Sequence, residues 1–292
     1  MSNANAIEPS TLSLLQSWVG NTEKANDTIT AVPVRALSAT LDRDDAAPVR
    51  GATLPPLWHW LYFLPTRAQS EIGIDGHPKR GGSLPPVPLP RRMWAGGRLH
   101  WEADNPLVVG DEVHRESCIL SVKHKAGRSG DLVFVVVQHT FHNHAGLAIT
   151  EEQDIVYRAA AQSGDPAPHP VVADKDPPWQ RALTPNEVLL FRYSALTLNG
   201  HRIHYDRPYA TGEEAYQGLV VHGPLIATLL VDLVGRENPQ VRIRSFDFKA
   251  VRPSFDGFPL RVCGRPASDS SAKLWAQDHE GWLAMQADIC FA

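Results

Sequence analysis

A run of apolar residues after Gly223 and Pro224 constrains this chain more than any other stretch. Its members are Leu225, Ile226, Leu229, Leu230, Leu233 and Val234, and they fall on nearly every face of a helix. Proline suits the first turn of a helix, and Gly235 is placed to end it. A helix that is apolar all round must be buried, so we expect a curved sheet to wrap around it.

Runs rich in β-branched and aromatic residues lie on both sides of this segment. Turn signals separate neighbouring runs and predict antiparallel hairpins, among them Asp256-Gly257 and His279-Glu280-Gly281. The predicted strands are 98–102, 112–125 and 132–144 with a continuation to 157, then 241–251, 259–263 and 274–291. Each half therefore passes from an apolar entry through an irregular segment to strands, which indicates an internal duplication.

Residues 161–180 contain five prolines and little periodicity, which is typical of a linker. We therefore expect an N-terminal unit over residues 1–160 and a C-terminal unit over residues 181–292.

Two irregular segments precede the first strands. Residues 54–65 form an aromatic run between prolines, which we interpret as a buried helix or a lid. Residues 73–97 are dense in glycine and proline, and long irregular segments of this kind are often functional. Arg91 and Arg92 near its end could hold an anionic group, although a solvated pair beside a strand is the simpler interpretation.

Composition narrows the partners. The 292 residues are 43% hydrophobic and 21% charged, with a formal charge of −4, which gives no electrostatic reason to expect nucleic acid or an anionic membrane as partner. The three cysteines lie far apart, so neither a disulfide framework nor a zinc site is predicted. The histidines of residues 139–144 are interpreted as a polar strand face, with no metal. No apolar run approaches the ~20 residues of a membrane span, and we expect a cytoplasmic protein.

The segment NGHRIHYD, Asn199 to Asp206, is followed by VVHGPL at residues 220–225. This pattern resembles the MaoC-like hydratase/dehydratase family, and within it the mitochondrial-type 3-hydroxyacyl-thioester dehydratases and the 3-methylfumaryl-CoA (mesaconyl-CoA) hydratases. The resemblance covers residues from about 185 to 292 well, and the first half by overall pattern and the segment PLPRRMWAGG. It implies an α+β double hot-dog fold, in which each unit is an antiparallel sheet wrapped around a long helix. The first unit would be non-catalytic and form the acyl cavity.

The resemblance assigns proton transfer to His204. Histidine suits this role because its pKa near 6.5 lets it exchange protons at working pH. Asn199 stands where many relatives have aspartate, and an amide can orient a water or an imidazole but cannot act as a base. Asp206 is a candidate to orient His204, and His201 a candidate second proton carrier, although a structural turn with a locally paired carboxylate is the favoured interpretation of Asp206.

The resemblance also places Gly223 at the acyl carbonyl. Unpaired N–H groups at a helix start can stabilise the negative charge of an enolate, and the amide of Gly223 is the expected donor because Pro224 has none. Substrate contacts are predicted for Arg91, Arg92, His222, Lys249 and Arg252, the last two for the phosphates of the carrier.

The expected function is that of a hydro-lyase, which adds water to an enoyl-type thioester of CoA or acyl-carrier protein, or removes it from the 3-hydroxyacyl thioester. No cofactor beyond the CoA of the substrate is implied, and family habit favours a homodimer. A dicarboxylic substrate would require Arg91 or Arg92 at its free carboxylate. Two alternatives remain open here: a non-catalytic acyl-thioester-binding protein, and a hot-dog thioesterase, which would need a carboxylate nearer the helix start than Asp232.

Overall fold

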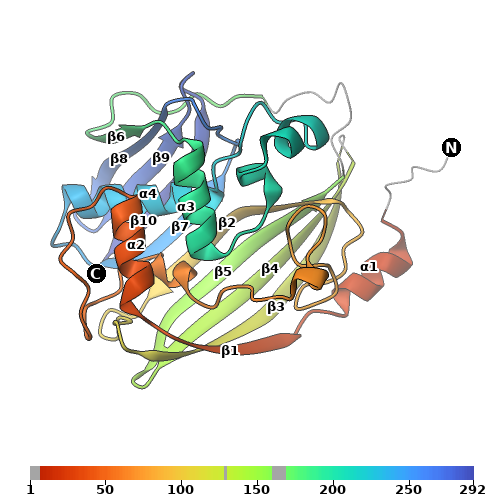
Figure 1. Cartoon of the computed structure of the whole chain (residues 1–292), viewed down its shortest axis with the longest axis horizontal. Helices are drawn as coiled ribbons and strands as arrows, with labels where there is room; N and C mark the ends of the chain where they lie inside the picture. Colours follow the sequence, from red (N-terminus) through yellow and green to blue (C-terminus); the bar gives the residue numbers. More distant parts are fainter. Residues whose placement is uncertain (1–6, 128–129, 160–168) are drawn as a thin grey trace.

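A single antiparallel sheet of ten strands forms the body of the molecule in the computed structural model, which describes residues 7–127, 130–159 and 169–292 (Figure 1). The strands are β1 (Thr22–Thr28), β2 (Arg91–Trp101), β3 (Glu112–Gly127), β4 (Gly130–Asn143), β5 (Gly146–Arg158), β6 (Trp179–Leu183), β7 (Ile243–Ala250), β8 (Leu260–Ser268), β9 (Ser271–Gln277) and β10 (Leu283–Phe291). Their order across the sheet is β1-β3-β4-β5-β2-β7-β10-β9-β8-β6.

The two halves share one topology. The first half runs β1-β3-β4-β5-β2 and the second runs β6-β8-β9-β10-β7, so equivalent strands occupy equivalent places and the predicted duplication is confirmed. The boundaries at 160 and 181 stay a prediction, because residues 160–168 lie outside the described part of the chain, and β6 already begins at Trp179.

The halves join where β2 pairs with β7, and two glycines permit that approach. A Cβ on Gly96 would lie 2.5 Å from the carbonyl oxygen of Phe248, and one on Gly97 would lie 3.0 Å from Cε1 of the Phe248 ring. Larger side chains would push the strands apart. The sheet therefore continues across the junction, with Gly96 opposite Lys249 in register.

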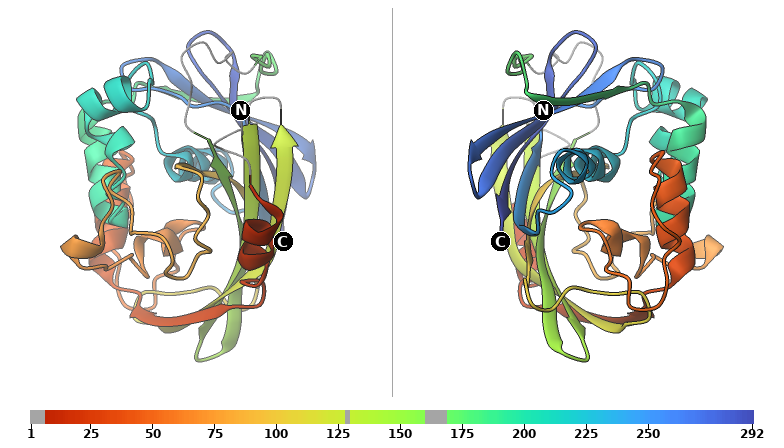
Figure 2. Two further views of the ribbon diagram at one scale, coloured as in Figure 1. Left: turned by 90° about the vertical axis from the view of Figure 1, so that its right-hand side faces the viewer. Right: turned by 90° about the vertical axis from the view of Figure 1, so that its left-hand side faces the viewer.

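The long helix α4 (Gly223–Glu237) lies inside the curve of the sheet (Figure 2). Every residue from Leu225 to Val234 is buried, as the apolar pattern predicted. The predicted stop at Gly235 is wrong, because α4 continues to Glu237. Glycine removes no backbone hydrogen bond, so a helix can pass through it at a cost of about 1 kcal/mol.

The first half differs in its helices. Its longest described helix is α2 (Ala31–Thr40), which packs beside α3 (Glu187–Thr197) of the second half on the open side of the sheet (Figure 2). The aromatic run at 54–65 forms only the short helix η1 (Trp58–Leu61) within irregular chain. The remaining helices are α1 (Pro9–Gln16), η2 (Gln69–Glu71), η3 (Arg202–His204) and the π-type turn η4 (Tyr209–Glu213).

One of the two predicted hairpin turns is confirmed. His279-Glu280-Gly281 connects the paired strands β9 and β10, with Gly281 at φ 83°. The hairpin prediction at Asp256-Gly257 is wrong, because β7 pairs with β2 and β10 whereas β8 pairs with β6 and β9. The Asp256 carboxylate instead accepts hydrogen bonds from the amide of Leu219 and from Arg207, and so fixes the chain that leads into α4.

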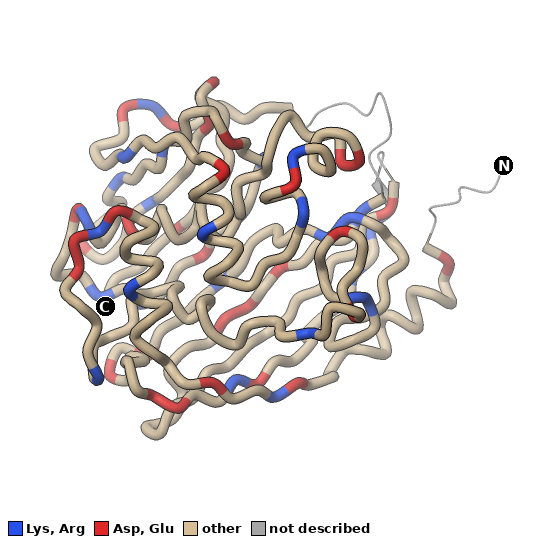
Figure 3. Tube along the Cα trace, in the orientation of Figure 1, with Lys and Arg blue, Asp and Glu red and all other residues tan. Residues whose placement is uncertain are grey.

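Segments of Lys and Arg are interspersed with segments of Asp and Glu in the described part of the trace (Figure 3), in line with the small net charge. Among the described residues, no helix has the length and apolar character needed to cross a membrane.

Candidate active site

His204 is a buried imidazole held in one tautomer. Helix α3 begins at an Asn186 cap, whose side chain accepts a hydrogen bond from the amide of Leu189 at 2.9 Å. The loop after α3 leads into the short helix η3, which ends at His204. The Nδ1 atom of His204 lies 2.7 Å from the carbonyl oxygen of Val220. A carbonyl can only accept, so Nδ1 carries the hydrogen and Nε2 keeps a free lone pair. Such a nitrogen can act as a base.

His222 stacks on His204, with ring centroids 3.7 Å apart and an interplanar angle of 18°. Its Nε2 is 2.8 Å from the hydroxyl of Ser194, and the side chain is fully buried. Burial is the main cause of the lowered pKa of both residues, to about 4 for His204 and well below the usual range for His222. Two neutral rings therefore stack at neutral pH.

Gly223 begins α4 directly beside these rings. As the first residue of the helix it has no intrahelical acceptor for its amide, and the helix dipole is positive there. A Cβ on Gly223 would meet only the carbonyl oxygen of Trp94, at 4.0 Å. Protein packing therefore does not require glycine at this position, whereas the close approach of a substrate carbonyl would.

Asn199 shapes the loop. Its Oδ1 accepts the amide of His201 at 3.0 Å. Asp206 pairs with Arg202 at 2.7 Å and accepts the amide of Tyr209, so the structural-turn interpretation is confirmed. The hypothesis that Asp206 orients His204 is wrong, since the Nδ1 of that histidine is bound to a backbone carbonyl.

A loop of the first half that contains Asp75 and Gly76 packs against the loop of residues 199–206. The sequence did not link this first-half loop to the site. The amide of Arg202 donates to the carbonyl of Asp75 at 2.9 Å. A Cβ on Gly76, which has φ 89°, would lie 1.8 Å from the carbonyl oxygen of Gly200, so only glycine permits the contact. The glycine density of residues 73–97 was the available signal, but no periodicity indicated where the loop would dock.

The docked loop adds a carboxylate, that of Asp75, and a fourth histidine, His77, to the site. Asp75 Oδ2 is 3.1 Å from Nδ1 of His77, and Asp75 Oδ1 accepts the His77 amide at 3.0 Å. The His77 ring lies 4.1 Å from that of His201, which lies 5.5 Å from that of His204. Burial is the main cause of the lowered pKa of His77 and of His201, the latter to about 2.

Asp75, His77 and His201 bring donor atoms within 4.8 Å of one another, and they are the described residues closest to a metal-binding arrangement. Two features disfavour a cation there. The Asp75–His77 hydrogen bond already engages one donor atom of each residue. The positive charge of Arg92 also acts on both histidines, in addition to burial.

The two predicted arginines occupy adjacent positions of β2 and so face opposite sides of the sheet. Arg91 is bound to Glu214 at 2.7 Å and lies over the ring of Tyr216. Arg92 is half-buried on the side of His77. No carboxylate among the described residues forms an ion pair with Arg92, whereas Arg91 is occupied.

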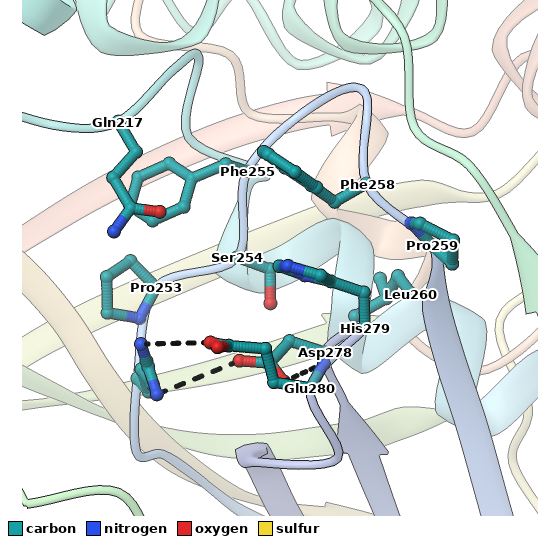
Figure 4. Close-up of a pocket in the computed structure, with 11 residues that line it drawn as sticks. Gln217, Pro253, Ser254, Phe255, Phe258, Pro259, Leu260, Asp278, His279 and Glu280 are labelled. Atoms are coloured by element: carbon teal, nitrogen blue, oxygen red, sulfur yellow. Dashed lines mark hydrogen bonds and ion pairs between the residues drawn. The ribbon is translucent and has the colours of Figure 1, made fainter.

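The two residues predicted to meet the carrier lie elsewhere. Lys249 is exposed on β7 and points away from α4, because Phe248 beside it faces the interior. Arg252 lines a small pocket between the β7–β8 loop and the β9–β10 hairpin (Figure 4). Its guanidinium is 3.9 Å from the carboxylates of Asp278 and Glu280, which offset its charge. Phosphate binding by Lys249 and Arg252 stays a prediction.

A buried histidine, His204, lies near the N-terminus of α4 within a duplicated sheet. This is the arrangement expected of the acyl-thioester hydratases and dehydratases that the sequence motif indicated. Residues 57–256 match the model of the hydroxyacyl-thioester dehydratase type 2 family, and the chain belongs to that family. It is 46% identical to the mesaconyl-C(4)-CoA hydratase of Chloroflexus aurantiacus over 276 residues, which are 94% of this chain and 96% of that protein.

Solved structures confirm the fold. A MaoC-like dehydratase superposes with a TM-score of 0.69 at 15% identity, covering 95% of this chain and 100% of the other. A Mycobacterium tuberculosis protein described as having a double hotdog fold superposes with a TM-score of 0.59 at 12% identity, covering 94% and 96%. The predicted double hot-dog architecture is therefore confirmed.

Proposed function

We propose that this chain is a hydro-lyase that adds water to the double bond of 3-methylfumaryl-CoA, the thioester named in the Chloroflexus relative as mesaconyl-C(4)-CoA. The observation that carries the proposal is the placement of a neutral histidine base, His204, beside the free amide of Gly223 at the start of α4. Base and oxyanion donor are the two elements that hydration of an α,β-unsaturated thioester requires.

The reaction follows from these two groups. Nε2 of His204 takes a proton from water while the water oxygen bonds to the β-carbon. The electron pair of the double bond moves toward the thioester carbonyl, whose oxygen becomes an enolate. The amide of Gly223 and the positive end of α4 stabilise that charge. A low pKa keeps His204 neutral at working pH, so the base is always in its active form.

Arg92 supports the dicarboxylic substrate. In 3-methylfumaryl-CoA the free carboxylate is bonded to the β-carbon, the atom that water attacks, so its partner must lie near the base. Arg92 is close enough to His77 and His201 for its charge to lower the pKa of each beyond the effect of burial. We assign the carboxylate to Arg92 rather than to Arg91, which is held by Glu214.

Thioesterase activity is the competing reaction. It would need a free carboxylate near the acyl carbonyl, but the first turn of α4 has no acidic residue, and the acidic residue nearest its start is Asp232. The Asp232 carboxylate is buried and accepts hydrogen bonds from three guanidinium groups, those of Arg43, Arg181 and Arg236. These contacts tie it to its surroundings and leave it no role as a nucleophile or base.

The test follows the enoyl absorbance of 3-methylfumaryl-CoA and of crotonyl-CoA with the purified chain and with His204→Ala. We expect hydration of the dicarboxylic substrate, and a loss of kcat of about 10²-fold to 10⁴-fold in the variant. His114→Ala is the matched control, because His114 lies on β3 of the first half and its side chain hydrogen-bonds to Asn26. Release of free thiol without loss of absorbance would indicate a thioesterase, and no reaction with either thioester would indicate a binding protein.

Location and assembly belong to the same proposal. We expect the enzyme to act in the cytoplasm as a homodimer and to need no cofactor beyond the CoA of its substrate. The size of the particle in solution, measured by light scattering, tests the dimer.

A further inference from the structure

The imidazoles of the site form a continuous row. Ring centroids lie 4.1 Å apart between His77 and His201, 5.5 Å between His201 and His204, and 3.7 Å between His204 and His222. Among the described residues, Asp75 is the carboxylate that hydrogen-bonds to this row, at its His77 end. Both His77 and Asp75 come from the half of the chain for which the sequence predicted no catalytic role.

The loop of residues 199–206 lacks a carboxylate at the position where many relatives have aspartate. Asn199 occupies the position of the family carboxylate, carries no titratable group, and its side-chain oxygen is engaged by the His201 amide. Hydration needs two proton transfers, however. One removes a proton from water and the other delivers a proton to the α-carbon.

We propose that His77, supported by Asp75, is the second acid-base group of the site and exchanges the proton at the α-carbon of the thioester. The carboxylate accepts from Nδ1–H of His77, so the ring is oriented and its Nε2 is left to carry the exchangeable proton. This inference rests on the proposed hydratase function and names the group that completes it.

The protons balance as follows. Hydration starts with a proton on Nε2 of His77 and none on Nε2 of His204. His204 gains the proton that water loses, the new C–O bond forms at the β-carbon, and the enolate takes the His77 proton at its α-carbon as the carbonyl re-forms. His204 then loses its proton to solvent and His77 regains one from solvent. Dehydration is the same sequence in reverse.

The groups around His77 determine its pKa and therefore the pH range in which it is protonated. Burial lowers its pKa most, the carboxylate of Asp75 raises it, and the cations Arg80 and Arg92 lower it. The other titratable groups near the Asp75–His77 pair are His201, His204 and Tyr209. Since Asp75 is the neighbour that favours the protonated ring, removing its charge must lower the pKa of His77.

The test is the pH profile of kcat/KM for hydration by wild type and Asp75→Asn. Protonated His77 is the acid, so activity falls as pH rises through its pKa. Loss of the carboxylate charge should move this alkaline limb to lower pH by about one unit or more, because nearby opposite charges shift a pKa by about 1 to 3 units. An unshifted limb in the variant overturns the proposal, whereas an inactive wild type would overturn the hydratase function itself.

A matched control separates this effect from a general loss of charge. His124 and Asp131 form a second His–carboxylate pair, 3.0 Å apart, in the β3–β4 hairpin. Asp131→Asn should leave the pH profile of kcat/KM in place. A shift of the same size in that variant would count against a specific role for Asp75.

His77→Gln keeps the test decisive if Asp75→Asn does not fold. Glutamine retains a hydrogen-bonding group but cannot carry the proton, so kcat should fall about 10²-fold to 10⁴-fold with little change in KM. Retention of more than about a tenth of kcat overturns the assignment. Loss of wild-type activity on dialysis against a chelator, restored by a divalent cation, would instead assign Asp75, His77 and His201 to a metal.

Discussion

The two halves share one strand order but fill the space beneath their strands differently. The second half places the apolar helix α4 there, with the neutral histidines His204 and His222 at its start. The first half, with only short described helices, buries a histidine–carboxylate pair instead. Glu151 of β5 is 3% exposed and lies 2.9 Å from Nε2 of His59.

This difference shows how the two halves of a duplicated fold can take different roles. In the proposed mechanism, the helix start of the second half supplies the oxyanion donor, and its loop supplies the base. The first half has an irregular segment where the second half has a long helix. This segment contacts the loop of residues 199–206 and places Asp75 and His77 against it. We infer that the histidines of the second half serve chemistry and that His59 and Glu151 serve stability.

Glu151→Gln gives the largest effect we expect on stability. The carboxylate also accepts from Nε1 of Trp60 at 3.0 Å, and its pKa is lowered because contact with His59 outweighs the effect of burial. Glutamine replaces a charged acceptor with a neutral one for the buried groups of both His59 and Trp60, so the free energy of unfolding in urea should fall by about 3 kcal/mol. The folded variant should keep its kcat.

Glu152→Gln is the control on the same strand. Glu152 faces the opposite side of the sheet and forms an exposed pair with Arg98 at 2.9 Å, so the free energy of unfolding should change by less than about 1 kcal/mol. If Glu151→Gln keeps its stability and loses hydration, the division of roles between the halves is wrong.

The main features of the second half could be predicted from the sequence, whereas much of the structure of the first half could not. The apolar pattern at residues 225–234 specifies a buried helix by itself, and His204 and Gly223 follow from a local motif. Docking of Gly76 on Gly200 joins segments more than a hundred residues apart, and no period or propensity encodes such a contact. The interpretation of residues 139–144 as a polar face was wrong for His139, which faces the interior and bonds to the hydroxyl of Ser117 at 2.7 Å.

Gly76→Ala tests whether the first half must dock for the site to work. The added Cβ would strike the Gly200 carbonyl, and the loop that carries Asp75 and His77 would have to move. We expect kcat/KM to fall about 10²-fold, since small misplacements in an active site cost this much. Gly81→Ala is matched, because Gly81 has the same φ of 89° with nothing within 4 Å of its Cβ. Equal losses in both variants would trace the effect to backbone strain alone.

The smallest effect we expect is a difference in how the halves respond to acid. Burial lowers the pKa of His204 to about 4, whereas an unfolded histidine titrates near 6.5, so the unfolded chain binds more protons between these values and stability falls as pH drops. This histidine alone accounts for about 2 kcal/mol between pH 7 and pH 5. The lowered pKa of Glu151 acts only at lower pH, where that carboxylate begins to protonate.

Urea unfolding at pH 7 and pH 5 measures the difference in wild type, in His204→Gln and in the control His114→Gln. The pH dependence should be about 2 kcal/mol smaller in His204→Gln than in wild type, and this reduction should exceed any change in the control. His201 and His222, whose pKa values are also lowered by burial, add to the wild-type loss with the same sign. If His204→Gln keeps the full pH dependence, His204 is not held neutral by burial, and the contrast between the neutral histidines of the second half and the buried carboxylate of the first half fails.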